Sequence, residues 1–206
     1  MFASVLNQVG EWNPQLFREL KGRLTKRNMA IATLFSIAFQ SILLLVFFSK
    51  LPTKFPSERS LWLGADRGRI YRSVHRYCTE SLAQLPYDGD IYECVTNATG
   101  KVVINWSQWW SEIFAFLTIA VSIGVLVLST YTIISDRSTE ERQGTFNFVR
   151  LSPQSATTIS VGKLLGVPCL VYLVALLALP LHWVSGLAAG IPIASILGVY
   201  IWFVAI

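Results

Sequence analysis

The chain has 206 residues, of which 53% are hydrophobic and 14% are charged, and its mean hydropathy is +0.50. Soluble globular domains carry about 25% charged residues, so this composition excludes an ordinary soluble domain. The net charge of +5 is explained by basic residues near membrane segments, and no nucleic-acid partner is expected. The apolar residues form four long runs, which predict an all-α integral membrane protein.

Residues 1–28 form a basic segment before the first apolar run. Asn13-Pro14 is typical of a helix start, because asparagine caps free amides and proline fits the first turn. Apolar residues then recur near helical spacing and predict an amphipathic helix along the membrane surface. They are Trp12, Leu16, Phe17, Leu20 and Leu24. The alternative is a basic topology signal with an incidental apolar stripe.

The four apolar runs are each long enough to cross a hydrocarbon core of about 30 Å. They cover 29–49, 113–134, 159–181 and 183–206, and Lys163 is their single charged residue. We expect this lysine to extend to the lipid phosphates. The fourth run reaches the end of the sequence without a polar flank, which indicates a piece of a longer protein.

The basic residues before the first span predict a cytoplasmic N-terminus, in a multi-pass protein of the inner or plasma membrane. The loop 50–112 is then extracytoplasmic and the loop 135–158 is cytoplasmic. A disulfide between Cys78 and Cys94 would stabilise the long loop by about 3 kcal/mol. The alternative is two free thiols.

Two stretches of the chain together resemble the ABC-2 type transporter permeases. Asn13-Pro14-Gln15-Leu16-Phe17-Arg18-Glu19-Leu20 looks like the helix that precedes the first span in that family. The run from Asp136 to Thr145, then Leu151-Ser152-Pro153 and Gly162-Lys163, resembles the family's first cytoplasmic loop. The family has six spans per subunit, so the resemblance implies that the four spans here belong to a six-helix fold.

The resemblance also implies that the loop 135–158 holds a short coupling helix, which contacts a separate ATPase. The residues expected at this contact are Glu140, Glu141, Arg142, Gly144, Thr145 and Phe146. Their charges would orient the contact, and the glycine would permit a tight turn. The alternative is an ordinary solvated connector.

No P-loop motif is present in the sequence, so ATP and Mg²⁺ are expected on the partner ATPase and no cofactor in this chain. We expect a non-enzymatic permease subunit that couples ATP hydrolysis to export, paired with a second permease subunit in the lipid membrane. One alternative is a membrane scaffold that binds a partner through its extracytoplasmic loop. Another is a lipid-directed enzyme that uses acidic loop residues such as Asp88 and Asp90.

Overall fold

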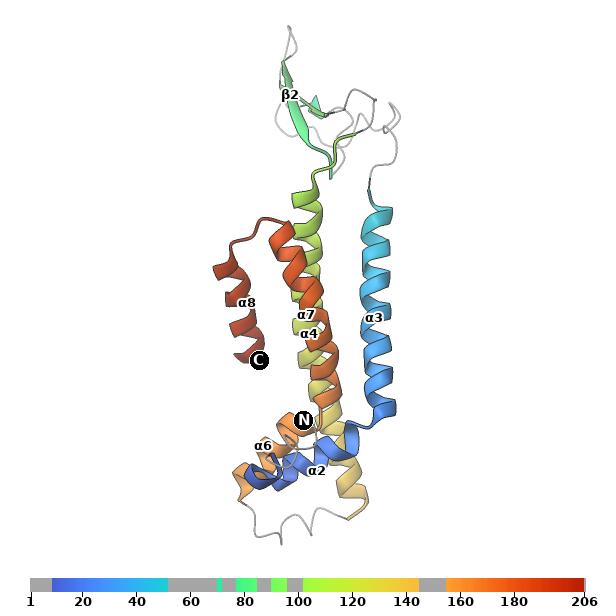
Figure 1. Cartoon of the computed structure of the whole chain (residues 1–206), viewed down its shortest axis with the longest axis vertical. Helices are drawn as coiled ribbons and strands as arrows, with labels where there is room; N and C mark the ends of the chain where they lie inside the picture. The colour runs from blue at the N-terminus through green and yellow to red at the C-terminus, as the bar shows by residue number, and fades with distance from the viewer. Residues whose placement is uncertain are drawn as a thin grey trace.

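A computed structural model of the chain describes residues 9–51, 70–71, 77–84, 90–95, 102–144 and 155–205. Three long helices run side by side: α3 (Lys26–Ser49), α4 (Trp106–Arg142) and α7 (Cys169–Ala188) (Figure 1). Each is long and apolar enough to cross a membrane. The expected bundle of apolar helices is therefore confirmed, although three helices of this kind are found in the described part and four were predicted.

Two short helices, α2 (Pro14–Arg23) and α6 (Ala156–Gly166), lie across one end of the bundle (Figure 1). The first residues of α3 and the last residues of α4 reach this same end. The strands lie at the opposite end, beyond the last residues of α3 and the first residues of α4. The strands and the two short helices thus lie at opposite ends of the bundle.

The predicted third span, 159–181, is wrong in its boundaries. The helix α6 ends at Gly166 and the chain leaves helical geometry at Pro168, whose φ is −87° and ψ is 18°, so the first part of this run is α6 and the rest belongs to α7. Proline lacks an amide hydrogen and crowds the preceding turn, which explains the break. Gly162 and Lys163 consequently lie outside the long helix in which we expected them.

The predicted fourth span, 183–206, is also wrong. Its first residues, as far as Ala188, belong to α7. A turn follows at Gly190, whose φ of +77° suits glycine, and α8 (Ile193–Ala205) then runs for 13 residues. That is shorter than the roughly 20 residues a span needs. His182, which separates the two predicted spans in the sequence, lies inside α7 and is 1% exposed.

The helix α7 holds the bundle together, because it packs against both α3 and α4. The helices α3 and α4 meet over a short stretch near the strands, where an apolar cluster is buried. Its members are Leu43, Phe47, Tyr77, Trp109, Ile113 and Leu117. The Trp109 indole is fully buried and donates a hydrogen bond to the Phe47 carbonyl oxygen at 3.0 Å, so this ring belongs to the core.

The long loop carries a small sheet that the sequence did not predict. Its strands are β1 (Ile70–Tyr71), β2 (Glu80–Gln84) and β3 (Asp90–Cys94), in the order β1-β3-β2. The strands β2 and β3 are antiparallel, with Glu80 opposite Cys94, and β1 is parallel to β3. The membrane part is therefore helical as expected, and the loop adds β-structure to it.

Cys78 is buried and disulfide-bonded. The chain has two other cysteines, Cys94 and Cys169, and Cys169 is free. Within one chain the composition thus leaves Cys94 as the partner. The side chain of Cys94 lies outside the described part of the structure, so the pairing stays a prediction.

Candidate functional site: an ion-pair junction of three helices

Asn13 joins α2 to α6 through both ends of its side-chain amide. Its Oδ1 accepts a hydrogen bond from the Leu16 amide at 3.0 Å and so caps α2, as the sequence predicted. Its Nδ2 donates to the carbonyl oxygen of Thr158 at 2.9 Å. The residue is 2% exposed, and one buried amide therefore both starts α2 and fixes it against α6.

Two glycines on α6 allow α2 to approach its backbone. A Cβ atom added at Gly162 would lie 2.9 Å from the Leu16 amide nitrogen, and one at Gly166 would lie 2.5 Å from the Glu19 Cβ. Real Cβ contacts are essentially never that short, so any side chain at either position would force the helices apart. The two glycines are four residues apart, a small-xxx-small spacing that lets helix backbones approach closely, and the face they form receives α2.

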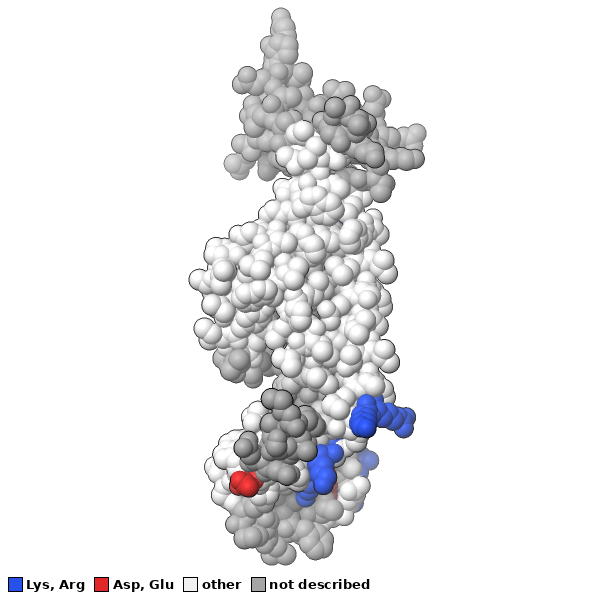
Figure 2. Space-filling view, viewed as in Figure 1, with Lys and Arg blue, Asp and Glu red and all other residues white. Residues whose placement is uncertain are grey.

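Six charged side chains meet where α2, α4 and α6 converge, and we call this set the junction. It consists of Arg18, Glu19, Arg23, Asp136, Glu140 and Lys163. Among the described residues on the face shown, charged side chains gather at this end of the molecule, and the described surface of the helices above them shows none (Figure 2). The junction thus lies next to the apolar part of the bundle.

Lys163 is the central cation of the junction. Its Nζ contacts Glu140 and lies 3.5 Å from Asp136, and its side chain is 11% exposed. The expectation that it extends to lipid phosphates is therefore wrong, because two carboxylates of α4 hold it inside the protein. A desolvated lysine needs such partners, since an unpaired buried charge is costly.

The arginines of α2 complete the network. Arg23 contacts Asp136 of α4 and donates its Nε–H to Glu19 at 3.2 Å, one helical turn away. Arg18 lies 3.5 Å from Glu19 and 4.0 Å from Glu140. Every pair of the three helices is consequently linked by an ion pair, a hydrogen bond or the glycine contact.

Three carboxylates of the junction come close enough to suggest a cation site. Oxygens of Glu19, Asp136 and Glu140 all lie within 4.8 Å of one another. Each of the three carboxylates is, however, already in contact with a cationic side chain of the junction. The donor set is thus matched by three cations, and its chemistry is that of an ion-pair network, not of a metal site.

The predicted coupling contact divides into two groups. Glu140 belongs to the junction, whereas Glu141 and Arg142 are exposed in the last turn of α4. Gly144 follows with a φ of +67° and ends the helix, as a glycine at this position typically does. Thr145 and Phe146 lie outside the described residues. Glu141, Arg142 and Gly144 therefore form the exposed edge of a rigid element.

The residues predicted to lie along the membrane surface also differ from one another in their exposure. Leu16 is 6% exposed because it packs against α6, so its apolar side chain serves a protein contact and not a lipid contact. Phe17, Leu20 and Leu24 are half-buried. Trp12 precedes α2 and is 67% exposed, and it remains the residue best placed to enter a membrane interface.

Sequence reasoning missed a second polar cluster around His182. Its Nε2 lies 2.8 Å from the Thr118 hydroxyl, and its Nδ1 lies 3.1 Å from the Tyr200 hydroxyl. The Thr118 hydroxyl donates to the Phe114 carbonyl, so it accepts from His182 Nε2–H, and Nδ1 then accepts from Tyr200. This cluster ties α4, α7 and α8 together. A histidine directly between two apolar runs was the signal for it, since such residues need partners.

Comparison with known proteins leaves the junction as the main guide to function. The chain matches no protein-family model, no curated protein and no solved structure.

Proposed function

We propose that the chain is a membrane-spanning permease subunit of an ABC-2 type transporter, and that a separate ATPase binds at the junction end. The observation that carries this proposal is the anchoring of the α4–α6 link. Glu140 before the link and Lys163 after it contact each other, and α2 is attached to both helices. A partner that pushes on the link would therefore move three helices together.

Exposed charge is available at the point where the partner would bind. Glu141 and Arg142 project from the end of α4 and are not among the ion pairs of the junction. Charges of this kind orient an incoming partner and raise the rate of encounter. In this proposal the ATPase binds ATP and Mg²⁺, the permease carries no cofactor, the junction end is cytoplasmic, and a second permease subunit completes the transporter.

The proposal is tested by purification of the tagged protein in mild detergent, with mass spectrometry of co-purifying proteins. We expect a P-loop ATPase with the wild type and its loss from the charge-swap variant E141R/R142E. The matched control is E11R/K21E, which also leaves net charge unchanged and alters two exposed residues at the same end. Absence of any ATPase from the wild type, or equal loss from both variants, would contradict the proposal.

One observation favours a second function, that of a scaffold which binds a partner through its long loop. The three-stranded sheet and the disulfide-bonded Cys78 make part of this loop a folded unit. A partner that co-purifies with the wild type and is lost when residues 70–95 are replaced by a flexible linker would support this function. The E141R/R142E variant would then retain the same partner.

A further inference from the structure

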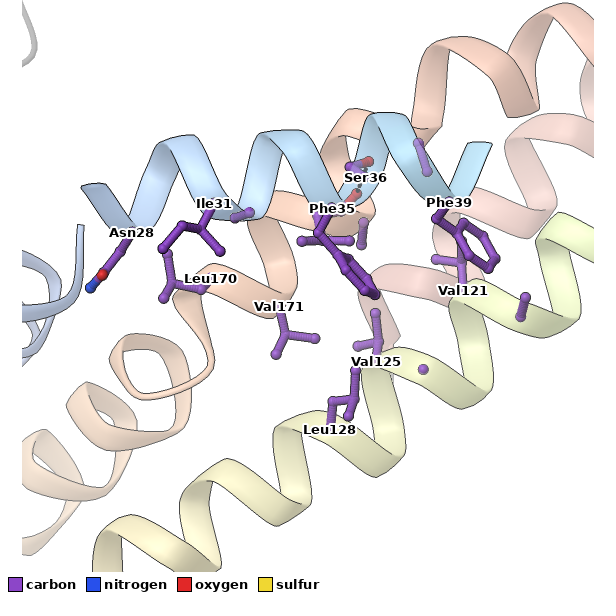
Figure 3. Close-up of a pocket in the computed structure, with 16 residues that line it drawn as sticks. Asn28, Ile31, Phe35, Ser36, Phe39, Val121, Val125, Leu128, Leu170 and Val171 are labelled. Carbon is purple, nitrogen blue, oxygen red and sulfur yellow. Dashed lines mark hydrogen bonds between the residues drawn. The ribbon is translucent and has the colours of Figure 1, made fainter. Parts of the chain in front are cut away.

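An apolar cavity of about 500 Å³ lies between α3, α4 and α7. Phe35 of α3, Val125 and Leu128 of α4 and Val171 of α7 project toward it (Figure 3). Small residues such as Gly124 and Ala175 leave it hollow. Its volume lies within the range of ligand pockets, about 300–1,000 Å³. The helices α3 and α4 touch each other at few positions whereas α7 packs against both, and the cavity is lined by residues of all three.

The depth of the cavity corresponds to one leaflet of a membrane. On α3 its lining extends from Asn28 to Phe39. At 1.5 Å per residue these positions are about 17 Å apart, which is roughly half of a 30 Å hydrocarbon core. The cavity therefore begins near the junction end and stops near the middle of the apolar layer.

Two cationic residues come directly before the part of α3 that lines the cavity, at its junction end. Lys26 and Arg27 directly precede Asn28, and both are exposed. Within the described residues no ion pair involves either of them, in contrast to the cations of the junction. A ligand with an apolar chain and an anionic head would meet an apolar wall along its chain and free positive charge at its head.

We propose that this cavity binds one acyl chain of an anionic phospholipid, with the phosphate at Lys26 and Arg27. The length, the apolar lining and the charge at one end all fit a lipid of the leaflet next to the junction. The proposal is independent of the permease function, since it requires neither an ATPase nor transport.

The test uses the full chain in phosphatidylcholine vesicles with a small fraction of phosphatidylglycerol that carries a photoreactive diazirine on an acyl chain. Mass spectrometry of the labelled peptides maps the contacts. We expect labelling concentrated on the cavity-lining residues of α3, α4 and α7 in the wild type. Labelling spread evenly over all apolar helix surfaces, or a second copy of the chain cross-linked at this site, would overturn the proposal.

Two variants separate a specific site from general lipid contact. G124F fills the cavity, and its added Cβ has no atom within 4 Å. G198F, whose Cβ position is equally open, adds the same ring on α8 and serves as the control. We expect cavity labelling to fall severalfold in G124F and to be unchanged in G198F. Equal labelling in the two variants would contradict the proposal.

The headgroup contact has its own test. Each Lys or Arg near a membrane surface contributes about fivefold to the binding of anionic lipid, so K26Q/R27Q should lower the preference for phosphatidylglycerol over phosphatidylcholine about 30-fold. The control K21Q/R142Q removes two exposed cations from the same end and should retain the preference. An unchanged preference in K26Q/R27Q would refute the assignment of the phosphate to these side chains.

Discussion

Replacement of Gly162 by alanine should release α2 from α6. The added Cβ would lie 2.9 Å from the Gln15 Cβ and 2.9 Å from the Leu16 amide nitrogen. Because the second of these is a backbone atom, no side-chain rotation relieves the contact. Overpacking of this kind costs about 1–3 kcal/mol. The burial of Leu16 contributes about 1.5–3 kcal/mol and one hydrogen bond about 1 kcal/mol, so the clash is comparable to the contacts that hold α2 against α6.

Hydrogen–deuterium exchange of the α2 amides measures this release directly. The helix has 10 residues, and isolated helices shorter than about 12–15 residues are marginal in water, so its protection depends on its contact with α6. A cost of 1–3 kcal/mol corresponds to exchange faster by about 5- to 160-fold. The amides of α4 and α7 should exchange as in the wild type.

Gly22 of α2 provides the matched control. A Cβ at this position has no atom within 4 Å, so G22A adds the same methyl group without a clash. Alanine favours a helix interior over glycine by about 0.5–1 kcal/mol, so exchange in α2 should slow. Equal exchange in G162A and the wild type, or equal acceleration in G162A and G22A, would refute the close contact between the two helices.

Three further predictions concern the polar contacts at the two ends of the bundle, each measured by thermal unfolding in detergent. Asn13→Ser keeps a capping oxygen but has no amide donor for the α6 carbonyl, so it should cost about 1 kcal/mol and clearly less than Asn13→Ala; equal losses would contradict the double role. Lys163→Gln should destabilise more than the double variant K163Q/E140Q, with a coupling free energy of about 0.5–3 kcal/mol, and additive effects would refute the pair. Trp109→Phe removes one of two donors to the Phe47 carbonyl oxygen, the other being the Lys50 amide at 3.3 Å, and puts a smaller ring into the apolar cluster. It should cost about 1–3 kcal/mol, whereas Trp106→Phe at an exposed position should cost less than about 0.5 kcal/mol. A larger effect at Trp106 would contradict this assignment.

The first two spans could be predicted from the sequence because uninterrupted apolar runs determine them. Residues 29–49 lie within α3, and residues 113–134 lie within α4. The break at Pro168 could not be predicted from the run that contains it, since prolines also occur inside membrane helices. Pro180 illustrates this, because α7 continues through it.

The junction could be predicted only in part. The cap at Asn13 depends on local sequence and was predicted, whereas the bond from the same side chain to Thr158 joins positions 145 residues apart. The charge of Lys163 indicated that it needed a partner, but nothing in the local sequence distinguished a lipid phosphate from Glu140. Pairings of this kind arise when three helices converge, and the sequence order does not specify that convergence.

The helices α4 and α7 differ in how they can respond to a force. The helix α4 is unbroken from Trp106 to Arg142 and contains no proline, so at 1.5 Å per residue it is a rod of about 55 Å. The path through α6 and α7 is interrupted at Pro168 and contains Pro180, two positions at which helices bend. A displacement of the junction therefore moves α4 as a single body and shifts Trp109 at its far end. The path through α6 and α7 bends instead, at Pro168 and Pro180.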